Sequence, residues 1–122
     1  MSRTEPRVID ELDQVFSSVA SYFALLAEPM RLRILHTICD GERSVSSIVE
    51  ATGASQTNVS RHLGLMHQAG VVGRRRVGTA VLYRLIDAEF AQICRMVCVR
   101  IAGQIEAEAP LRRELLDFAA NR

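Results

Sequence analysis

The chain has 122 residues, of which 48% are hydrophobic, and a formal net charge of +1. This length fits a single domain over residues 1–122, with enough apolar side chains for a folded core. No apolar run approaches the roughly 18 residues of a membrane-spanning helix, and the polar first residues lack the apolar segment of a signal peptide. Three cysteines, an odd number, argue for a reducing compartment rather than a disulfide framework. We therefore expect a cytoplasmic protein with no membrane partner.

The basic residues are concentrated in the middle of the chain. Residues 51–86 carry five Arg and no Asp or Glu, whereas residues 1–50 and 87–122 are net acidic, at −3 and −1. An acid-free stretch with this density of arginine is typical of a surface that contacts phosphate groups. The charge pattern therefore indicates nucleic acid as a partner.

Two amphipathic helices are expected before the basic stretch. Over residues 8–27, apolar side chains recur at three- and four-residue steps, which is the pattern of one helix face. The stripe consists of Ile9, Leu12, Phe16, Val19, Phe23 and Leu26. It can serve either as core or as a seam that faces a partner chain. Pro29 suits the first position of a second helix, which is expected to end near Gly41.

Residues 44–70 carry the signals of a helix-turn-helix. Ser44 is a good N-cap for a short helix that stops at Gly53, and Ser55 is a good N-cap for the next helix, which is closed by Gly70. In this motif the second helix enters the major groove of DNA with its N-terminal side chains on base edges. The expected DNA-binding residues of this helix are Ser55, Gln56, Thr57, Asn58, Ser60, Arg61 and His62. For the histidine, packing inside the protein is the alternative to a phosphate contact.

Residues 71–86 predict a β-hairpin, the wing, with Gly78 in its turn. Alternation along a strand puts Arg74 and Arg76 on one face and Arg75 on the other. The three arginines therefore cannot all make the same contact, and at least one should reach the minor groove or flanking phosphates. The expected wing contacts are Arg74, Arg75, Arg76, Gly78 and Thr79.

A further amphipathic helix is expected over residues 88–109, followed by a short helical tail from Leu111 to Asn121. Cys94 and Cys98 lie beside the apolar stripe of this helix, four residues apart. Their Cβ atoms should be about 5–6 Å apart, which is too far for a relaxed disulfide, although two such thiols could hold a soft metal ion. The predicted fold class is mainly α with a small β-hairpin, arranged as a winged helix-turn-helix.

The region between about residues 23 and 85 contains the segments LAEPMRLRIL, GERSV, TNVSRHLGLMHQAGVV and RRRVGTAVLYRL. In this order they resemble the ArsR/SmtB family of bacterial winged-helix repressors. The resemblance implies a homodimer built on the N- and C-terminal helices (8–27 and 88–109), a palindromic operator in double-stranded DNA, and release from DNA by an inducer. The two amphipathic stripes outside the DNA-binding region fit such a dimer interface.

The family's standard metal sites are absent from this sequence. Ser44 and Ser46 stand where arsenic- and cadmium-responsive members carry a Cys-x-Cys pair. The last long helix has no His, which zinc-, cobalt- and nickel-responsive members use there. His36 and His67 remain as other ligand candidates.

Cys39, Cys94 and Cys98 are the candidate sensing residues. Their layout is similar in outline to the persulfide and redox sensors of the family, which pair one Cys of the second helix with one of the last, although His36 stands where those sensors carry their first Cys. It also resembles members whose arsenite sites use cysteines at non-standard places. Two inducers that act on these cysteines are therefore open: a reactive sulfur species or oxidant, which we favour, and arsenite or another thiophilic metal ion. A member of the family with no inducer at these cysteines is the third possibility. Arg95 beside Cys94 would favour its reactive thiolate.

The predicted function is a sequence-specific DNA-binding transcriptional repressor that an inducer releases by acting on cysteines. The alternative of another class is a winged-helix protein-interaction module, in which the cysteines are small core residues. No Ser/His/Asp set, carboxylate pair or glycine-rich phosphate loop is spaced for catalysis, so we expect neither an enzyme nor a required cofactor.

Overall fold

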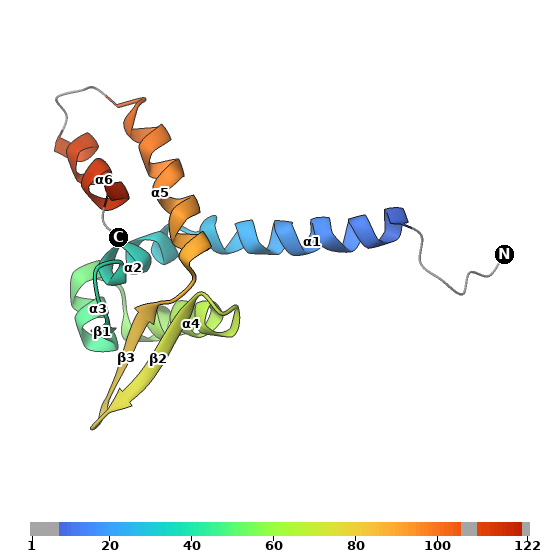
Figure 1. Cartoon of the computed structure of the whole chain (residues 1–122). Helices are drawn as coiled ribbons and strands as arrows, with labels where there is room; N and C mark the ends of the chain where they lie inside the picture. The colour runs from blue at the N-terminus through green and yellow to red at the C-terminus, as the bar shows by residue number, and fades with distance from the viewer. Residues whose placement is uncertain (1–7, 106–109, 121–122) are drawn as a thin grey trace.

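The computed structural model describes residues 8–105 and 110–120. Its elements are α1 (Val8–Leu26), α2 (Pro29–Ile38), β1 (Arg43–Ser44), α3 (Val45–Thr52), α4 (Gln56–Gln68), β2 (Val72–Val77), β3 (Ala80–Leu85), α5 (Ala88–Ala102) and α6 (Pro110–Ala120) (Figure 1). The predicted class, mainly helical with a small hairpin, is confirmed. In the described part of the chain, no helix is long and apolar enough to cross a membrane.

The helix-turn-helix forms where its capping residues predict it. The Ser44 hydroxyl accepts a hydrogen bond from the Ser47 backbone N–H at 3.1 Å, and the Ser55 hydroxyl accepts one from Asn58 N–H at 3.1 Å. These bonds satisfy backbone donors that the first turns of α3 and α4 leave unpaired. Gly53 ends α3 in the left-handed region, at φ 73°, where a side chain would be strained. Local chemistry therefore sets where each of the two helices begins and where α3 ends.

One aliphatic core holds the helix-turn-helix against the sheet and the first turns of α5. Its members from six elements and the adjoining loop are Ile34, Leu35, Ile38, Ile48, Val59, Leu63, Met66, Val71, Val72, Tyr83, Phe90 and Cys94. Apolar burial on this scale is the main stabilising term for so small a domain. Helix α4 packs into this core through Val59, Leu63 and Met66, and its opposite side remains exposed to solvent.

The sheet has three antiparallel strands in the order β1-β3-β2, one more strand than the predicted hairpin. The extra strand, β1, pairs Arg43 with Tyr83 and Ser44 with Leu82. Two polar residues have no alternating pattern, so the sequence gives no strand signal there. The turn between β2 and β3 lies at Gly78 with φ 61°, as the sequence predicts.

Helix α5 is shorter than the predicted 88–109. It ends at Ala102 and is followed by turns in which Gln104 N–H donates to the Ile101 carbonyl and Ile105 N–H to the Ala102 carbonyl. Such i to i+3 bonds tighten a helix end, and Gly103, a poor helix former, follows the last helical residue. The remaining predicted residues, 106–109, lie outside the described residues. The helical tail is confirmed as α6, which begins at Pro110 and lies beside α5 (Figure 1).

The N-cap of α3 provides a test of this fold. We expect Ser44→Ala to lower the free energy of unfolding by about 1 kcal/mol, because the Ser47 N–H loses its partner. Ser46→Ala is the matched control: it removes an exposed hydroxyl from the same helix and should change stability by less than about 0.5 kcal/mol. Urea unfolding at one protein concentration measures both, and equal effects for the two variants would contradict the capping role.

Candidate nucleic-acid interface

The N-terminal side of α4 presents a row of polar side chains to solvent. Ser55, Gln56, Thr57, Ser60 and Arg61 are exposed and Asn58 is half-buried. The Arg61 guanidinium donates to the Asn58 side-chain oxygen at 2.8 Å, so these two groups orient each other. Free backbone N–H groups at a helix N-terminus also attract phosphate. This side of α4 therefore combines donors for base edges with an anion-binding helix end.

His62 differs from the other predicted contacts of α4, because its side chain packs inside. It is 3% exposed, and Arg31 donates from Nε to His62 Nδ1 at 3.2 Å. Burial, followed by the positive charges of Arg61 and Arg31, lowers the pKa of His62 below its ordinary 6.5. The structure favours the packing alternative for His62 over a phosphate contact, because its enclosed imidazole supports α4 from within.

The wing extends from the body beside α4 (Figure 1), and its predicted contact residues are all exposed. The strand is uninterrupted, with Arg74 opposite Tyr83 and Arg76 opposite Val81. Arg74 and Arg76 therefore share the inner face of the hairpin, whose base is buried, and Arg75 lies on the outer face. Gly78 and Thr79 form the exposed tip. The alternation predicted for the three arginines is present.

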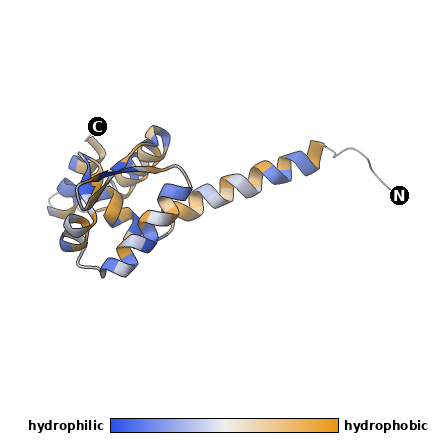
Figure 2. Ribbon diagram, turned by 90° about the horizontal axis from the view of Figure 1, so that it is seen from below, coloured by the Kyte–Doolittle hydropathy of each residue, from blue (hydrophilic) through white to orange (hydrophobic). Residues whose placement is uncertain are grey.

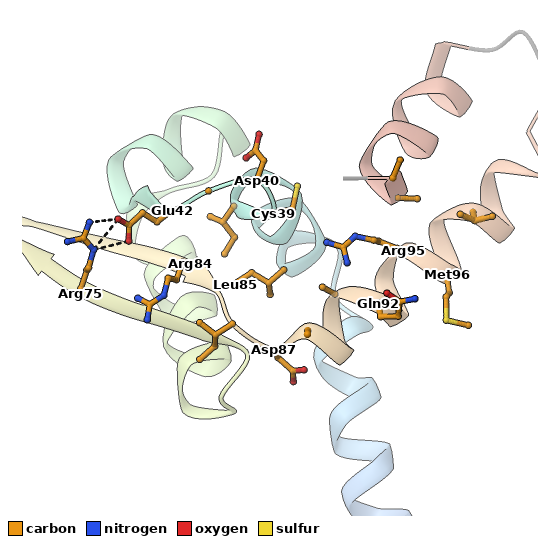
Figure 3. A pocket seen from close by; sticks show the side chains of 18 residues that line it. Cys39, Asp40, Glu42, Arg75, Arg84, Leu85, Asp87, Gln92, Arg95 and Met96 are labelled. Atoms are coloured by element: carbon orange, nitrogen blue, oxygen red, sulfur yellow. Dashed lines mark hydrogen bonds and ion pairs between the residues drawn. The ribbon is translucent and has the colours of Figure 1, made fainter. Parts of the chain in front are cut away.

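One residue of this interface has no counterpart in the sequence-based expectations. Glu42, in the loop between α2 and β1, accepts hydrogen bonds from Arg75 Nε on both carboxylate oxygens at 3.0 Å, and Arg75 Nη2 also donates to Glu42 Oε1 (Figure 3). The pair lowers the pKa of Glu42 and raises that of Arg75. The two residues are 33 positions apart, so no local spacing could have revealed the contact.

The three cysteines lie in the region where residues of α2, α5 and α6 line shared cavities. Cys39, at the C-terminal end of α2, is half-buried, and its thiol donates to the His36 carbonyl at 3.1 Å. Cys39 and Cys94 line the same small cavity, beside Phe118. Cys94 and Cys98 line a separate apolar groove of about 630 Å³, together with His36. The structure thus brings the predicted pairs to shared cavities, with Cys94 common to both.

Burial makes the two thiols of α5 poor thiolates. Cys94 is 6% exposed, and burial, followed by the charge of Cys98, raises its pKa to about 11, although Arg95 lowers it. Burial also raises the pKa of Cys98. Arg95 therefore lowers the pKa of Cys94 as expected, but burial raises it by more. Since the thiolate is the reactive form, these two side chains react more slowly than an ordinary thiol would.

A larger groove of about 1280 Å³ lies between the outer face of the wing, the end of α2 and α5. Figure 3 shows Glu42, Arg75 and Arg84 at one end of it, Cys39 in the middle and Arg95 on the α5 side. Among residues 8–105 and 110–120, no three His, Cys, Asp or Glu side chains are grouped so as to hold a metal ion.

A helix-turn-helix followed by an arginine-bearing hairpin defines a winged-helix DNA-binding protein. The family described as "Bacterial regulatory protein, arsR family" matches residues 28–73. The HTH-type transcriptional regulator Rv0081 of Mycobacterium tuberculosis is 33% identical over 95 residues, which cover 75% of this chain and 83% of that protein. The chain therefore belongs to the ArsR family, whose members are DNA-binding transcriptional repressors.

Two further proteins extend the comparison. A protein of Streptomyces lividans named as the probable repressor of a mercury resistance operon is 33% identical over 102 residues, 73% of this chain and 82% of that protein. The homodimeric winged helix-turn-helix DNA-binding domain Mb0332 of Mycobacterium bovis superposes with a TM-score of 0.67 at 34% identity, covering 87% of this chain and 94% of that domain. The Mycobacterium bovis protein is named as a possible ArsR-family transcriptional regulator, in keeping with the predicted regulatory function.

Burial of His62 makes stability depend on pH. Because the folded pKa lies below the unfolded value of 6.5, the unfolded chain binds the proton more readily, and stability falls as the pH drops below about 6.5. We expect His62→Gln to flatten the dependence of the unfolding free energy on pH between about 7.5 and 5.5. His67→Gln is the control for loss of a histidine from the same helix. An unchanged profile in His62→Gln would contradict the enclosed, neutral imidazole.

Proposed function

We propose that a homodimer of this chain represses transcription by binding a palindromic operator, and that chemical change at its thiols releases it. The observation that carries the DNA-binding part is the exposed, acid-free N-terminal side of α4, with the arginine wing beside it. In the proposed complex, Gln56 and Asn58 meet base edges in the major groove, where their amides suit adenine. Arg74 and Arg76 reach flanking phosphates or the minor groove.

The homodimer is supported by the apolar side of α1. This helix extends away from the body with none of its residues buried (Figures 1 and 2). Its exposed apolar side chains are Val8, Ile9, Leu12, Val15, Phe16, Val19 and Phe23, with exposed fractions between 45% and 73%. A continuous apolar stripe on an isolated helix calls for a partner surface. Val97 and Ile101 on α5 are also exposed and apolar, and the Mycobacterium bovis relative is a homodimer.

For the inducer, the structure favours Cys39 as the first thiol to react. Cys39 is half-buried and lines the large open groove, whereas Cys94, with its pKa of about 11, has fewer than about one thiolate in a thousand near neutral pH. A sulfane-sulfur donor would transfer one sulfur atom to the Cys39 thiolate and leave as a thiolate. Cys94 would then attack the inner sulfur of the Cys39 persulfide and displace hydrosulfide, which leaves a disulfide across their shared cavity.

Peroxide would reach the same disulfide by another route. The Cys39 thiolate would take one oxygen atom to give a sulfenic acid and release hydroxide, and the Cys94 thiol would condense with it and release water. By either route, the disulfide would draw α2 and α5 together, so the dimer would no longer fit both half-sites. A hundredfold loss of operator affinity requires only about 2.7 kcal/mol of coupling.

Arsenite or another thiophilic metal ion is the second candidate inducer. Cys94 and Cys98 face the same groove one helical turn apart, with His36 on its other side, and soft thiolate ligands select such ions. The mercury-linked name of the Streptomyces relative favours the same chemistry. An ion at this position would have to displace the thiol protons of two groups whose pKa values are raised, which makes its uptake weaker at low pH.

DNA reading by α4 can be tested with one pair of variants. We expect Gln56→Ala to weaken binding to this protein's own promoter fragment by about 1–3 kcal/mol, with little effect on unrelated DNA, because a base contact is lost and phosphate contacts are kept. Gln68→Ala, an exposed glutamine at the other end of the same helix, is the control. Fluorescence anisotropy at fixed salt measures both. Equal binding by wild type and Gln56→Ala would remove Gln56 from the reading surface.

The thiol mechanism can be tested by intact mass and gel shift on the same samples. Reduced protein is treated separately with a persulfide donor, peroxide and arsenite. We expect the first two to oxidise Cys39 and release the promoter fragment, and Cys39→Ser to retain full DNA affinity without release. Release with a retained arsenic atom that depends on Cys94 and Cys98 would favour the second candidate. Release of Cys39→Ser by persulfide or peroxide would contradict the order of reaction proposed.

A further inference from the structure

The outer face of the wing contains a small charge cluster that is separate from the inner arginines. Glu42 is held by Arg75 in a bidentate arrangement, and Arg84 is close enough to lower the pKa of the same carboxyl (Figure 3). The side chain of Arg75 is 56% exposed and that of Glu42 26% exposed. The two-oxygen geometry fixes the direction of the guanidinium, which a single-point contact would not do.

Gly73 has no side chain, which leaves room on β2 for the guanidinium of Arg84. A Cβ atom at Gly73 would lie 3.3 Å from the guanidinium carbon of Arg84, which is tighter than an ordinary contact. The Arg84 head therefore lies across the backbone of β2, opposite Gly73 in the register. Gly73 and Arg75 are two residues apart and share a face, so Arg84 and Arg75 lie on the same side, with Glu42 near both.

We propose that Glu42 is a positioning residue that holds Arg75 away from the DNA phosphates, so that only Arg74 and Arg76 of the three wing arginines bind DNA. The proposal rests on the DNA binding by the wing set out above. A carboxylate in contact with Arg75 offers the geometry that a phosphate would otherwise supply. The loop that carries Glu42 follows α2 directly, which places the carboxylate beside β2 without any movement of the wing.

The expected consequence is a lower affinity and a weaker salt dependence than five arginines in residues 51–86 suggest. Each phosphate contact adds about 0.9 to the slope of log affinity against log salt concentration. If Glu42→Gln releases Arg75 onto a phosphate in both wings of a dimer, the slope should steepen by about 1.8. The loss of affinity between 50 mM and 200 mM salt would then be about tenfold larger than for wild type.

A double-mutant cycle separates this effect from simple removal of negative charge. The proteins are wild type, Glu42→Gln, Arg75→Ala and the double variant, each titrated with the promoter fragment at several salt concentrations. We expect Arg75→Ala alone to keep the wild-type slope, and Glu42→Gln to steepen it only where Arg75 is present. Asp40→Asn is the matched charge control, because it removes a carboxylate from the same groove without changing the Glu42–Arg75 pair.

Three outcomes would overturn the proposal. A slope reduced by about 1.8 in Arg75→Ala would mean that Arg75 already contacts phosphate. An equal effect of Glu42→Gln with and without Arg75 would mean that the carboxylate acts only by repulsion. Arg74→Ala provides the separate check on DNA binding by the wing: a shallower slope in Arg74→Ala together with no change in Glu42→Gln would refute this inference alone. Unfolding curves for all variants exclude a loss of folded protein.

Discussion

The Asp87 carboxylate joins the parts of the molecule that the proposed dimer and the DNA-binding surface use. One of its oxygens accepts a hydrogen bond from the Tyr22 hydroxyl at 3.0 Å, and the other caps α5 by accepting from Phe90 N–H at 2.9 Å. The backbone N–H of Asp87 donates to the Val71 carbonyl at 3.2 Å, which closes the base of the wing. Burial, followed by the bond to Asp87, raises the pKa of Tyr22 to about 12. The end of α1, the start of α5 and the wing are therefore fixed to one another.

This junction explains how a change among the helices could reach DNA. A dimer fits both half-sites of a palindrome only when its two recognition helices are about one or two turns of DNA apart. Because α1 and α5 are tied to the base of the wing through Asp87, a shift of either helix would move the wing with it. Cys39 and Glu42 provide a second connection, since both belong to the segment between α2 and β1. A disulfide at Cys39 and the contact that holds Arg75 would thus both involve the segment of residues 39–42.

The sequence predicts most of this fold because most of its boundaries are set by local chemistry. Caps at Ser44 and Ser55, the turn at Gly78 and the alternation of the wing arginines each depend on residues a few positions apart. Two features that sequence patterns miss depend on distant partners: strand β1 exists through β3, and Arg75 is held by Glu42. The burial of His62 has the same origin, because its neighbour Arg31 comes from another helix. The early end of α5 before Gly103 has a local cause instead. For the cysteines, the sequence predicts which thiols lie near one another, but the pKa of each thiol depends on how deeply the fold buries it.

Formal charge along the chain therefore differs from the charge that DNA would meet. Arg75 is neutralised by Glu42, and Arg61 is engaged by Asn58, so the arginines of residues 51–86 are not equivalent. Long-range attraction depends on the sum of charges and is screened within about 8 Å at physiological salt, whereas a phosphate contact needs a free guanidinium. The acid-free stretch would steer the protein to DNA, while the residues that surround each arginine would decide which of them binds. An acid outside that stretch, at position 42, thus limits what the arginines inside it can do.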